Sequence, residues 1–212
     1  MPLFPQLFTQ PIDHDLCRAA GVKGLIFMTD EARVGPSQDI IKHLPAGTVV
    51  IFRDYDALDR AALATDVQQA CRQSKCPFFI AGDLDLAKAL GADGIHLPEW
   101  MLATMAPDDL KGLRVTAACH SPQSLLAAHN LDVDMMLISP IFQTDSHPNA
   151  KTLGIAGFIN MIRASTIPMT GLNGKIAALG GINPQTAKQL QNLTALGVTL
   201  GAVAAISGLI NK

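Results

Sequence analysis

Short apolar segments alternate along the chain with longer segments of mixed polarity. The apolar segments are nearly continuous, as expected of parallel strands that are buried on both faces of a sheet. Several of the segments between them show helical periodicity. The candidate strands cover residues 24–29, 48–53, 77–81, 94–97, 114–118, 134–139, 175–179 and 198–203.

The segments between the strands supply the candidate helices. Pro122 and Pro184 suit a first helical turn, and Ser121 and Asn183 before them are candidate N-caps. Residues 13–20 suit a helix that covers the bottom of a barrel, whereas too few residues follow the last strand for a full helix. The candidate helices cover residues 57–72, 84–90, 122–129, 155–164 and 184–193, with a short one at 37–43.

Strand and helix alternate often enough to predict a single (β/α)8 barrel, an α/β fold that spans residues 1–212. An open, doubly wound parallel sheet is the alternative. The count of eight strands in a chain of 212 residues favours the barrel. We expect no second domain.

Charge and composition narrow the classes of function. The formal net charge is -2 and no basic run is present, so we expect no nucleic-acid partner. No apolar stretch reaches the ~18 residues of a membrane span, and the first residues lack the features of a signal peptide. We therefore expect a cytoplasmic protein with no membrane partner. The four cysteines form no CxxC pair and suit free thiols of a reducing compartment.

In such barrels the functional residues follow the strands. Gly180 and Gly181 end the seventh candidate strand, where backbone N–H groups can approach an anion ahead of a helix. Ala205 and Ile206 follow the eighth candidate strand, and we expect the end of this strand to complete a phosphate cup. The alternative is that the glycine pair merely permits a tight turn.

Further polar candidates follow strands 2 to 6. His96 and Glu99 suit an acid/base pair, although His96 also suits a structural role beside a neighbouring loop. The loop after strand 6 is long for a βα connection and carries side chains that can donate to an anion. The alternative is a solvated loop with incidental polar residues. The candidates in chain order are Arg53, Asp83, His96, Glu99, His120, Thr144, Ser146, His147 and Lys151.

Three segments resemble thiamine-phosphate synthase and its TenI-like relatives, namely residues 85–97, 138–154 and 178–184. Together with residues 48–53, the resemblance covers most of the chain. It implies a (β/α)8 barrel and a part in thiamine biosynthesis. The synthase joins a pyrimidine pyrophosphate to a thiazole phosphate with magnesium, whereas TenI-like proteins bind or isomerise thiazole phosphate.

The same resemblance implies roles for single residues. Arg53 matches a synthase arginine, and Gly154, Gly180, Gly181 and the end of strand 8 match the thiazole-phosphate cup. Other positions depart from the synthase pattern. Its lysine after strand 2 is Tyr55 here, its Asn-Asp pair is Ala81-Gly82, its second metal-binding aspartate is Met101, its lysine in the strand 6 loop is His147, and the tautomerase histidine is Pro140.

We therefore expect a synthase-type transferase that acts on a small phosphorylated heterocycle, with a TenI-like binding protein or isomerase lacking synthase activity as the alternative. Magnesium is a possible cofactor, no organic cofactor is expected, and a homo-oligomer is compatible with the sequence. The expected catalytic residues are Arg53, His120, Ser146 and His147; the phosphate-binding residues are Thr144, Gly154, Gly180, Gly181, Ala205 and Ile206; and the metal ligands are Asp83 and Glu99.

Overall fold

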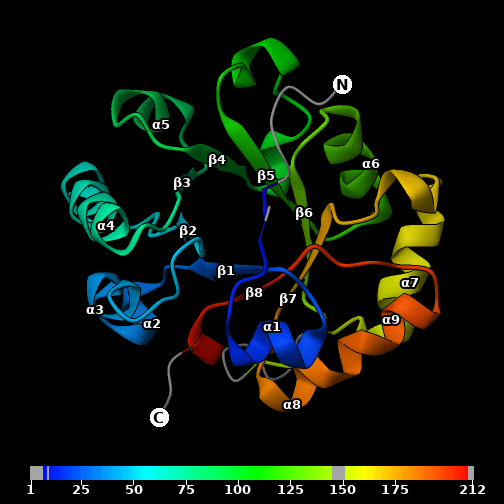
Figure 1. Cartoon of the computed structure of the whole chain (residues 1–212). Coiled ribbons are helices and arrows are strands. Elements are labelled where there is room, and N and C mark those ends of the chain that lie inside the picture. Colours follow the sequence, from blue (N-terminus) through cyan, green and yellow to red (C-terminus); the bar gives the residue numbers. More distant parts are fainter. Residues whose placement is uncertain (1–6, 9, 145–150, 210–212) are drawn as a thin grey trace.

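Eight parallel strands pair in chain order and close into a barrel through the pairing of β1 with β8 (Figure 1). The structure is a computed structural model that describes residues 7–8, 10–144 and 151–209. The predicted (β/α)8 barrel is thereby confirmed. The strands are β1 (Gly24–Met28), β2 (Val49–Phe52), β3 (Phe78–Ala81), β4 (Gly94–Leu97), β5 (Arg114–Cys119), β6 (Met135–Ile138), β7 (Ile176–Leu179) and β8 (Ala202–Ala205).

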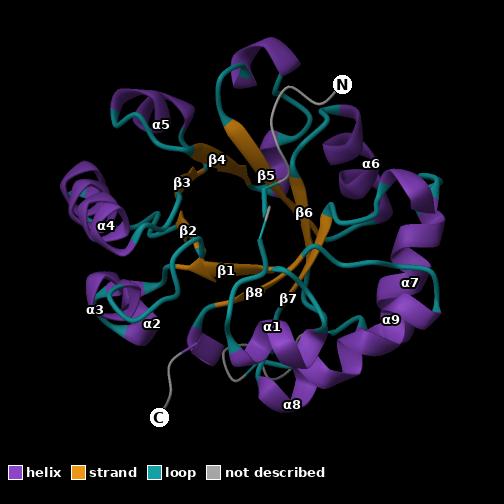
Figure 2. Cartoon of the chain, viewed as in Figure 1, coloured by secondary structure: helices purple, strands orange, loops and turns teal. Residues whose placement is uncertain are grey.

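Helices surround the barrel on all sides (Figure 2). The predicted N-caps Ser121 and Asn183 are confirmed, since their side chains accept backbone N–H groups of the following turn. The α-helices are α1 (Asp15–Ala20), α2 (Glu31–Val34), α3 (Ser37–Ile41), α4 (Arg60–Ser74), α5 (Leu84–Ala89), α6 (Pro122–Asn130), α7 (Gly154–Ala164), α8 (Pro184–Ala187) and α9 (Asn192–Ala195). Short 3-10 helices are η1 (Glu99–Met101), η2 (Pro107–Leu110), η3 (Met169–Gly171), η4 (Lys188–Gln191) and η5 (Ser207–Leu209).

Two predicted starts were wrong by three residues or more, and one predicted helix is divided. The helix expected from residue 57 begins at Arg60, because Asp59 caps it by accepting the N–H of Ala62 at 3.0 Å. The helix expected over residues 184–193 is divided into α8, η4 and α9. The last strand begins at Ala202 instead of residue 198, because Val198 donates back to the Leu193 carbonyl and so still belongs to the preceding turn.

The register decides which side chains face the inside of the barrel, because paired residues of neighbouring parallel strands share a face and alternate residues point to opposite faces. A separate outer cluster, including Phe52 and Phe78, packs with Val67 of α4 and Ile41 of α3. The inner set includes Ile26, Met28, Val49, Ile51, Phe79, Ala81, Gly94, His96, Thr116, Ala118, Leu137, Ala177 and Ala204.

The amino end of the barrel is covered by the first described residues. A Cβ on Gly24 would lie 2.3 Å from the ring of Phe8, so this buried ring packs directly on the start of β1. Arg114 donates to the Leu7 carbonyl at 3.5 Å. The predicted bottom helix is confirmed as α1, which contacts β1, β8 and α8 (Figure 1). The carboxyl ends of the strands lie at the opposite end of the barrel.

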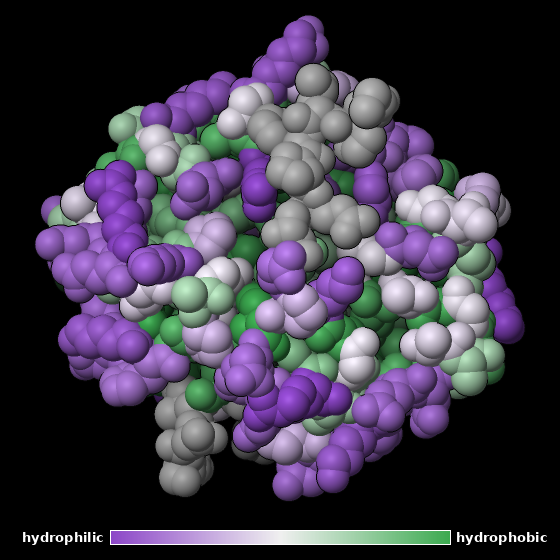
Figure 3. Space-filling view, viewed as in Figure 1, coloured by the Kyte–Doolittle hydropathy of each residue, from purple (hydrophilic) through white to green (hydrophobic). Residues whose placement is uncertain are grey.

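The surface of the molecule carries both polar and apolar residues. Figure 3 shows hydrophilic residues around the outline and hydrophobic ones between them near the centre of the view. None of the helices in the described part of the chain has the length and apolarity that crossing a membrane requires. The four cysteines are confirmed as free, and all four are buried.

We predict that Gly201 cannot be enlarged without loss of stability. A Cβ there would lie 2.1 Å from the Gly174 carbonyl oxygen, which belongs to the backbone and cannot move aside alone. We expect Gly201→Ala to lower the free energy of unfolding by about 1–3 kcal/mol, the usual cost of overpacking.

Gly171→Ala is the matched control, because its nearest new contact would be an ordinary 3.5 Å. Urea unfolding measures both variants. Equal stability of Gly201→Ala and Gly171→Ala would contradict the close approach.

Candidate active site

Four polar side chains share the inner face at the carboxyl end of the barrel. Arg53 lies two residues beyond Ile51, His96 is in β4, His120 lies two residues beyond Ala118, and Ser139 lies two residues beyond Leu137. Because alternate residues share a face, all four continue inward-facing rows. Burial is the main cause that lowers the pKa of His96, and the nearby Arg53 and His120 lower it further.

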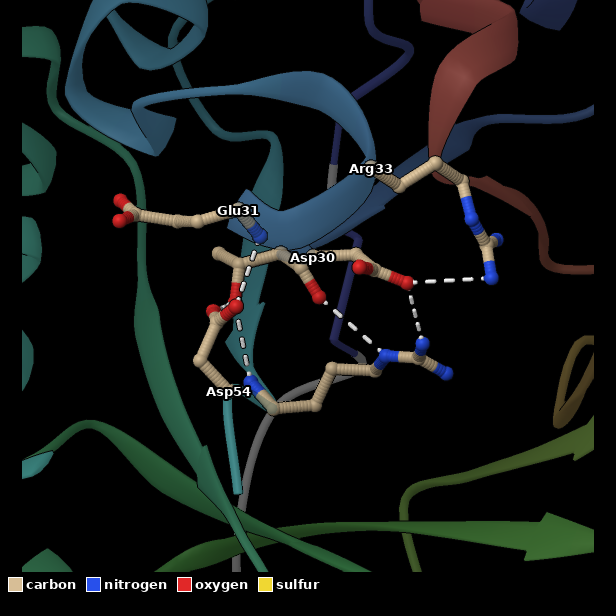
Figure 4. Close-up of polar contacts among 6 residues, drawn as sticks. Asp30, Glu31, Arg33 and Asp54 are labelled. Carbon is tan, nitrogen blue, oxygen red and sulfur yellow. Dashed lines mark hydrogen bonds and ion pairs between the residues drawn. The ribbon is translucent and has the colours of Figure 1, made fainter. Parts of the chain in front are cut away.

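Arg53 is held by an ion pair with Asp30, which follows β1. The guanidinium Nη2 lies 2.7 Å from Asp30 Oδ2, and Nε donates to the Thr29 carbonyl at 3.2 Å. Arg33 reaches the same carboxylate at 3.2 Å (Figure 4). The Asp30 side chain is only 14% exposed. Two guanidinium groups therefore share one carboxylate, and the carboxylates of Glu31 and Asp54 line the same cavity as Arg53.

The backbone beneath this cluster is fixed by Asp54. Its carboxylate accepts the Thr29 hydroxyl and the N–H of Glu31, the latter at 2.7 Å (Figure 4). The Thr29 hydroxyl in turn accepts the N–H of Arg53 at 3.0 Å. These bonds join the end of β1 to the end of β2. A cavity of about 420 Å³ lies beside them, lined in part by Asp30, Arg53 and Tyr55.

His96 is buried inside the barrel and is a structural residue. Its Nδ1 lies 2.9 Å from Thr116 Oγ1, and the residue is 2% exposed. Burial lowers its pKa to about 3, with smaller contributions from the nearby Arg53 and His120. A neutral, buried imidazole does not serve as an acid near neutral pH, and Glu99 accepts a hydrogen bond from Ser121 instead. The suggested His96–Glu99 pair is therefore wrong, and the structural alternative holds.

His120 is oriented by the end of β6. Its Nδ1 lies 3.0 Å from the Ser139 carbonyl oxygen and 3.2 Å from the Ser139 hydroxyl. Because a carbonyl oxygen can only accept, Nδ1 carries the proton that is donated to it. The other ring nitrogen, Nε2, then has a lone pair for a substrate, or a second N–H when the ring is protonated.

The glycine pair after β7 has both a packing role and free donors. A Cβ on Gly181, whose φ is +64°, would lie 2.3 Å from the Gln143 carbonyl oxygen, so the loop after β6 passes against the glycine backbone. The Gly180 carbonyl accepts the N–H of Phe142 at 3.0 Å. Within the described residues, the N–H groups of Gly181, Ile182 and Ile206 donate to no protein acceptor. The tight turn and the proposed anion cup are therefore compatible.

One expected contributor to the cup, Gly154, is already engaged, and so is the side chain of Asn183, which follows the glycine pair. Asn183 accepts the N–H groups of Gln185 and Thr186, so its side chain occupies the start of the helix. The N–H of Gly154 donates to the Ile141 carbonyl at 2.8 Å, which ties the start of α7 to the end of β6. The remaining donors come from the strand ends themselves, and Ala205 is the last residue of β8.

The expected magnesium ligands make other contacts. Asp83 accepts the N–H of Leu86 at 2.9 Å and pairs with Arg60 at 3.2 Å, so both of its oxygens have partners. Glu99 accepts the Ser121 hydroxyl at 2.8 Å. Among residues 7–8, 10–144 and 151–209, no three His, Cys, Asp or Glu side chains are grouped as a metal site. Proteins usually hold magnesium through one or two carboxylates together with waters and substrate phosphates, so Asp83 and Glu99 would have to exchange these partners to bind it, and their role as ligands stays a prediction.

Three candidates of the strand 6 loop lie within or beside residues 145–150, which the structure does not describe. Ser146 and His147 lie outside the described residues, and Thr144 is half-buried beside the segment that is not described.

Sequence reasoning missed Asp30, the partner of Arg53. The signal was present, since Asp30 lies two residues beyond the inward-facing Met28 and therefore on the same face.

We predict that His96 makes the fold acid-sensitive. Its pKa of about 3 in the folded protein lies below the ordinary value near 6.5, so the unfolded chain binds the extra proton and stability falls as pH drops below about 6.5. Between pH 7 and 5 this group should remove about 2 kcal/mol.

His96→Gln removes the titration and should show a pH-dependent loss smaller by about that amount, as measured by urea unfolding at both pH values. Identical pH dependence of the two proteins would refute the assignment.

Known proteins resemble this chain over most of its length. The family model of thiamine monophosphate synthase (TMP-TENI) matches residues 25–208. The thiamine-phosphate synthase of Pasteurella multocida is 33% identical over 66% of this chain and 62% of its own length. That of Geobacillus kaustophilus is 27% identical over 78% of this chain and 76% of its own length.

Among solved structures, a thiamine phosphate pyrophosphorylase from Pyrococcus furiosus superposes with a TM-score of 0.61 at 23% identity, covering 90% of this chain and 88% of its own, which supports the fold. The family match extends from β1 to the end of β8 and includes the glycine pair and the basic groups at the barrel mouth. The chain belongs to the thiamine monophosphate synthase family.

Proposed function

We propose that this chain is a transferase of the thiamine-phosphate synthase type, which joins a pyrimidine pyrophosphate to a thiazole phosphate. The observation that carries the proposal is the barrel mouth, where basic groups and free backbone N–H groups occupy different strand ends. Arg53 and His120 follow β2 and β5, whereas Gly181 and Ile206 follow β7 and β8. The family match supports the same reaction.

The reaction needs two anionic groups to be bound at once. The thiazole nitrogen attacks the methylene carbon of the pyrimidine substrate, the carbon–oxygen bond breaks, and pyrophosphate departs with the electron pair. Negative charge on the departing oxygen therefore grows in the transition state, and preorganised donors there accelerate the step. Binding the thiazole phosphate elsewhere would fix the nucleophile and reduce the entropy cost of the encounter.

The glycine cup suits the thiazole phosphate. The N–H groups of Gly181, Ile182 and Ile206 have no acceptor among the described residues. Such N–H groups bind anions without a fixed charge, because several peptide dipoles act together. Gly181 also lacks the side chain that would obstruct a close approach.

The leaving pyrophosphate suits the opposite side of the mouth. Arg53 shares Asp30 with Arg33, so its guanidinium is already held in position when an anion arrives in a cavity that Glu31 and Asp54 also line. An arginine can grip two phosphate oxygens at once. His120 adds a second donor when protonated, and its ring is fixed by Ser139. No step is routed through a metal ion.

We predict that removing Arg53 slows the reaction, whereas removing its ion-pair partner Asp30 strengthens the binding of pyrophosphate. Arg53→Gln should lower the rate of thiamine phosphate formation at least ~100-fold, the scale of losing one strong electrostatic contact. Asp30→Asn removes the carboxylate that both guanidinium groups share and should tighten the binding of inorganic pyrophosphate severalfold. The substrates are combined with and without magnesium, the product is measured by chromatography, and pyrophosphate binding is measured by calorimetry.

Arg72→Gln, an exposed change near the end of α4, is the control and should match the unaltered protein in both measurements. Melting temperatures show whether each variant is folded. The proposed function would be contradicted if the unaltered protein, supplied with both substrates, formed no thiamine phosphate with magnesium and none without it.

A further inference from the structure

We infer that Tyr55 and Trp100 form a stacking platform for the pyrimidine ring at the rim of the barrel, where the family pattern has charged residues. This inference rests on the proposed function, because the identity of the ring comes from the proposed substrate. The platform itself is defined by Tyr55, Gly82 and Trp100, which follow β2, β3 and β4.

The two aromatic side chains meet over Gly82. A Cβ on Gly82 would lie 3.0 Å from Tyr55 Cε1 and 3.7 Å from Trp100 Cζ2, with Pro98 Cγ at 3.4 Å. Gly82 thus forms a floor between the two rings that any side chain would fill. The sequence contains one tyrosine and one tryptophan, and both lie here.

Tyr55 is fixed in place by Arg60. The guanidinium carbon lies 5.5 Å from the centre of the Tyr55 ring and 5.2 Å from that of Phe52. Arg60 is itself tied to Asp83 and to the Ala81 carbonyl, the latter at 2.7 Å. A ring held on one face by a fixed cation is ordered before any ligand arrives, and ordering in advance reduces the entropy cost of binding.

Both rings are unusually open to solvent for residues of their size. Trp100 is 70% exposed and Tyr55 is 48% exposed, whereas phenylalanines such as Phe52 are fully buried. Burial raises the pKa of Tyr55, although Arg53 and Arg60 oppose the shift, so the phenol stays neutral at physiological pH. The two rings themselves present uncharged aromatic surface, which suits a planar ring.

The position of the platform fits the pyrimidine substrate. Tyr55 and Arg53 line the same cavity of about 420 Å³, together with the carboxylates of Asp30, Glu31, Asp54 and Asp56. A ring that stacks on Tyr55 therefore lies beside the guanidinium proposed to hold the pyrophosphate, so one molecule can reach both.

The single tryptophan provides a direct test. The probe is the free 4-amino-5-hydroxymethyl-2-methylpyrimidine, which carries no phosphate, titrated without magnesium. We expect it to quench the fluorescence of Trp100 saturably. Tyr55→Ala keeps the reporter and should weaken the affinity at least about fivefold, the lower end of what one lost base–aromatic stack costs. Tyr55→Phe keeps the ring and should bind as the unaltered protein does.

Leu196→Ala is the matched control, because this exposed apolar residue precedes β8 and lies at the other end of the barrel. Its affinity should not change. A melting temperature confirms that Tyr55→Ala is folded; if it is not, the comparison is made with Trp100→Ala by calorimetry, where the same weakening is expected.

Several results would overturn the platform. They are no quenching at saturating pyrimidine, equal affinity of Tyr55→Ala and Leu196→Ala, or a Trp100 emission that changes with protein concentration alone, which would show that a second copy covers the rings. Failure here is separable from failure of the proposed function. Product formation with no effect of Tyr55→Ala on pyrimidine binding removes the platform alone, whereas quenching without product removes the transferase reaction alone.

Discussion

The register of the closed barrel is the constraint on which the rest of the structure depends. Once β1 pairs with β8, every alternate residue is committed to the inside, and the last inward positions of the strands become the walls of one mouth. Asp30 and Arg53 meet because each lies two residues beyond paired inward positions, Met28 and Ile51. A slip of one residue in this pairing would send the arginine outward and leave the mouth without its charge.

The mouth is divided by chemistry into regions with different charge. Arg53 and Arg33 share Asp30 on one side, free N–H groups of the strand ends lie after β7 and β8, and neutral aromatic rings lie over Gly82. His96 lies deeper and stays uncharged because it is buried, so it supports β4 and β5 through Thr116 and contributes no charge. Such a division suits two substrates that each join a flat ring to a phosphate.

Much of this arrangement could be predicted from the sequence. Continuous apolar segments gave all eight strands, and Ser121 and Asn183 were identified as caps because their chemistry is local. The start of β8 was misplaced because residues 198–201 are as apolar as a strand, and only contacts with distant residues, such as Gly201 with Gly174, show that they lie outside it. In the sequence, nothing indicates that Asp83 and Glu99 have partners. In the structure, Arg60 donates to Asp83 from 23 residues away and Ser121 donates to Glu99 from 22 residues away. Pairings of this kind depend on tertiary structure, which periodicity does not contain.

Different strand ends of the same mouth are proposed to hold the two ends of the product. A crystal structure of this protein with thiamine phosphate bound tests this proposal most directly. We predict the phosphate within hydrogen-bonding distance of the N–H groups of Gly181 and Ile206, with the pyrimidine ring against Tyr55 and Trp100. A phosphate bound at the Arg53 cluster with the pyrimidine ring over the glycine pair, or product bound outside the barrel mouth, would contradict it.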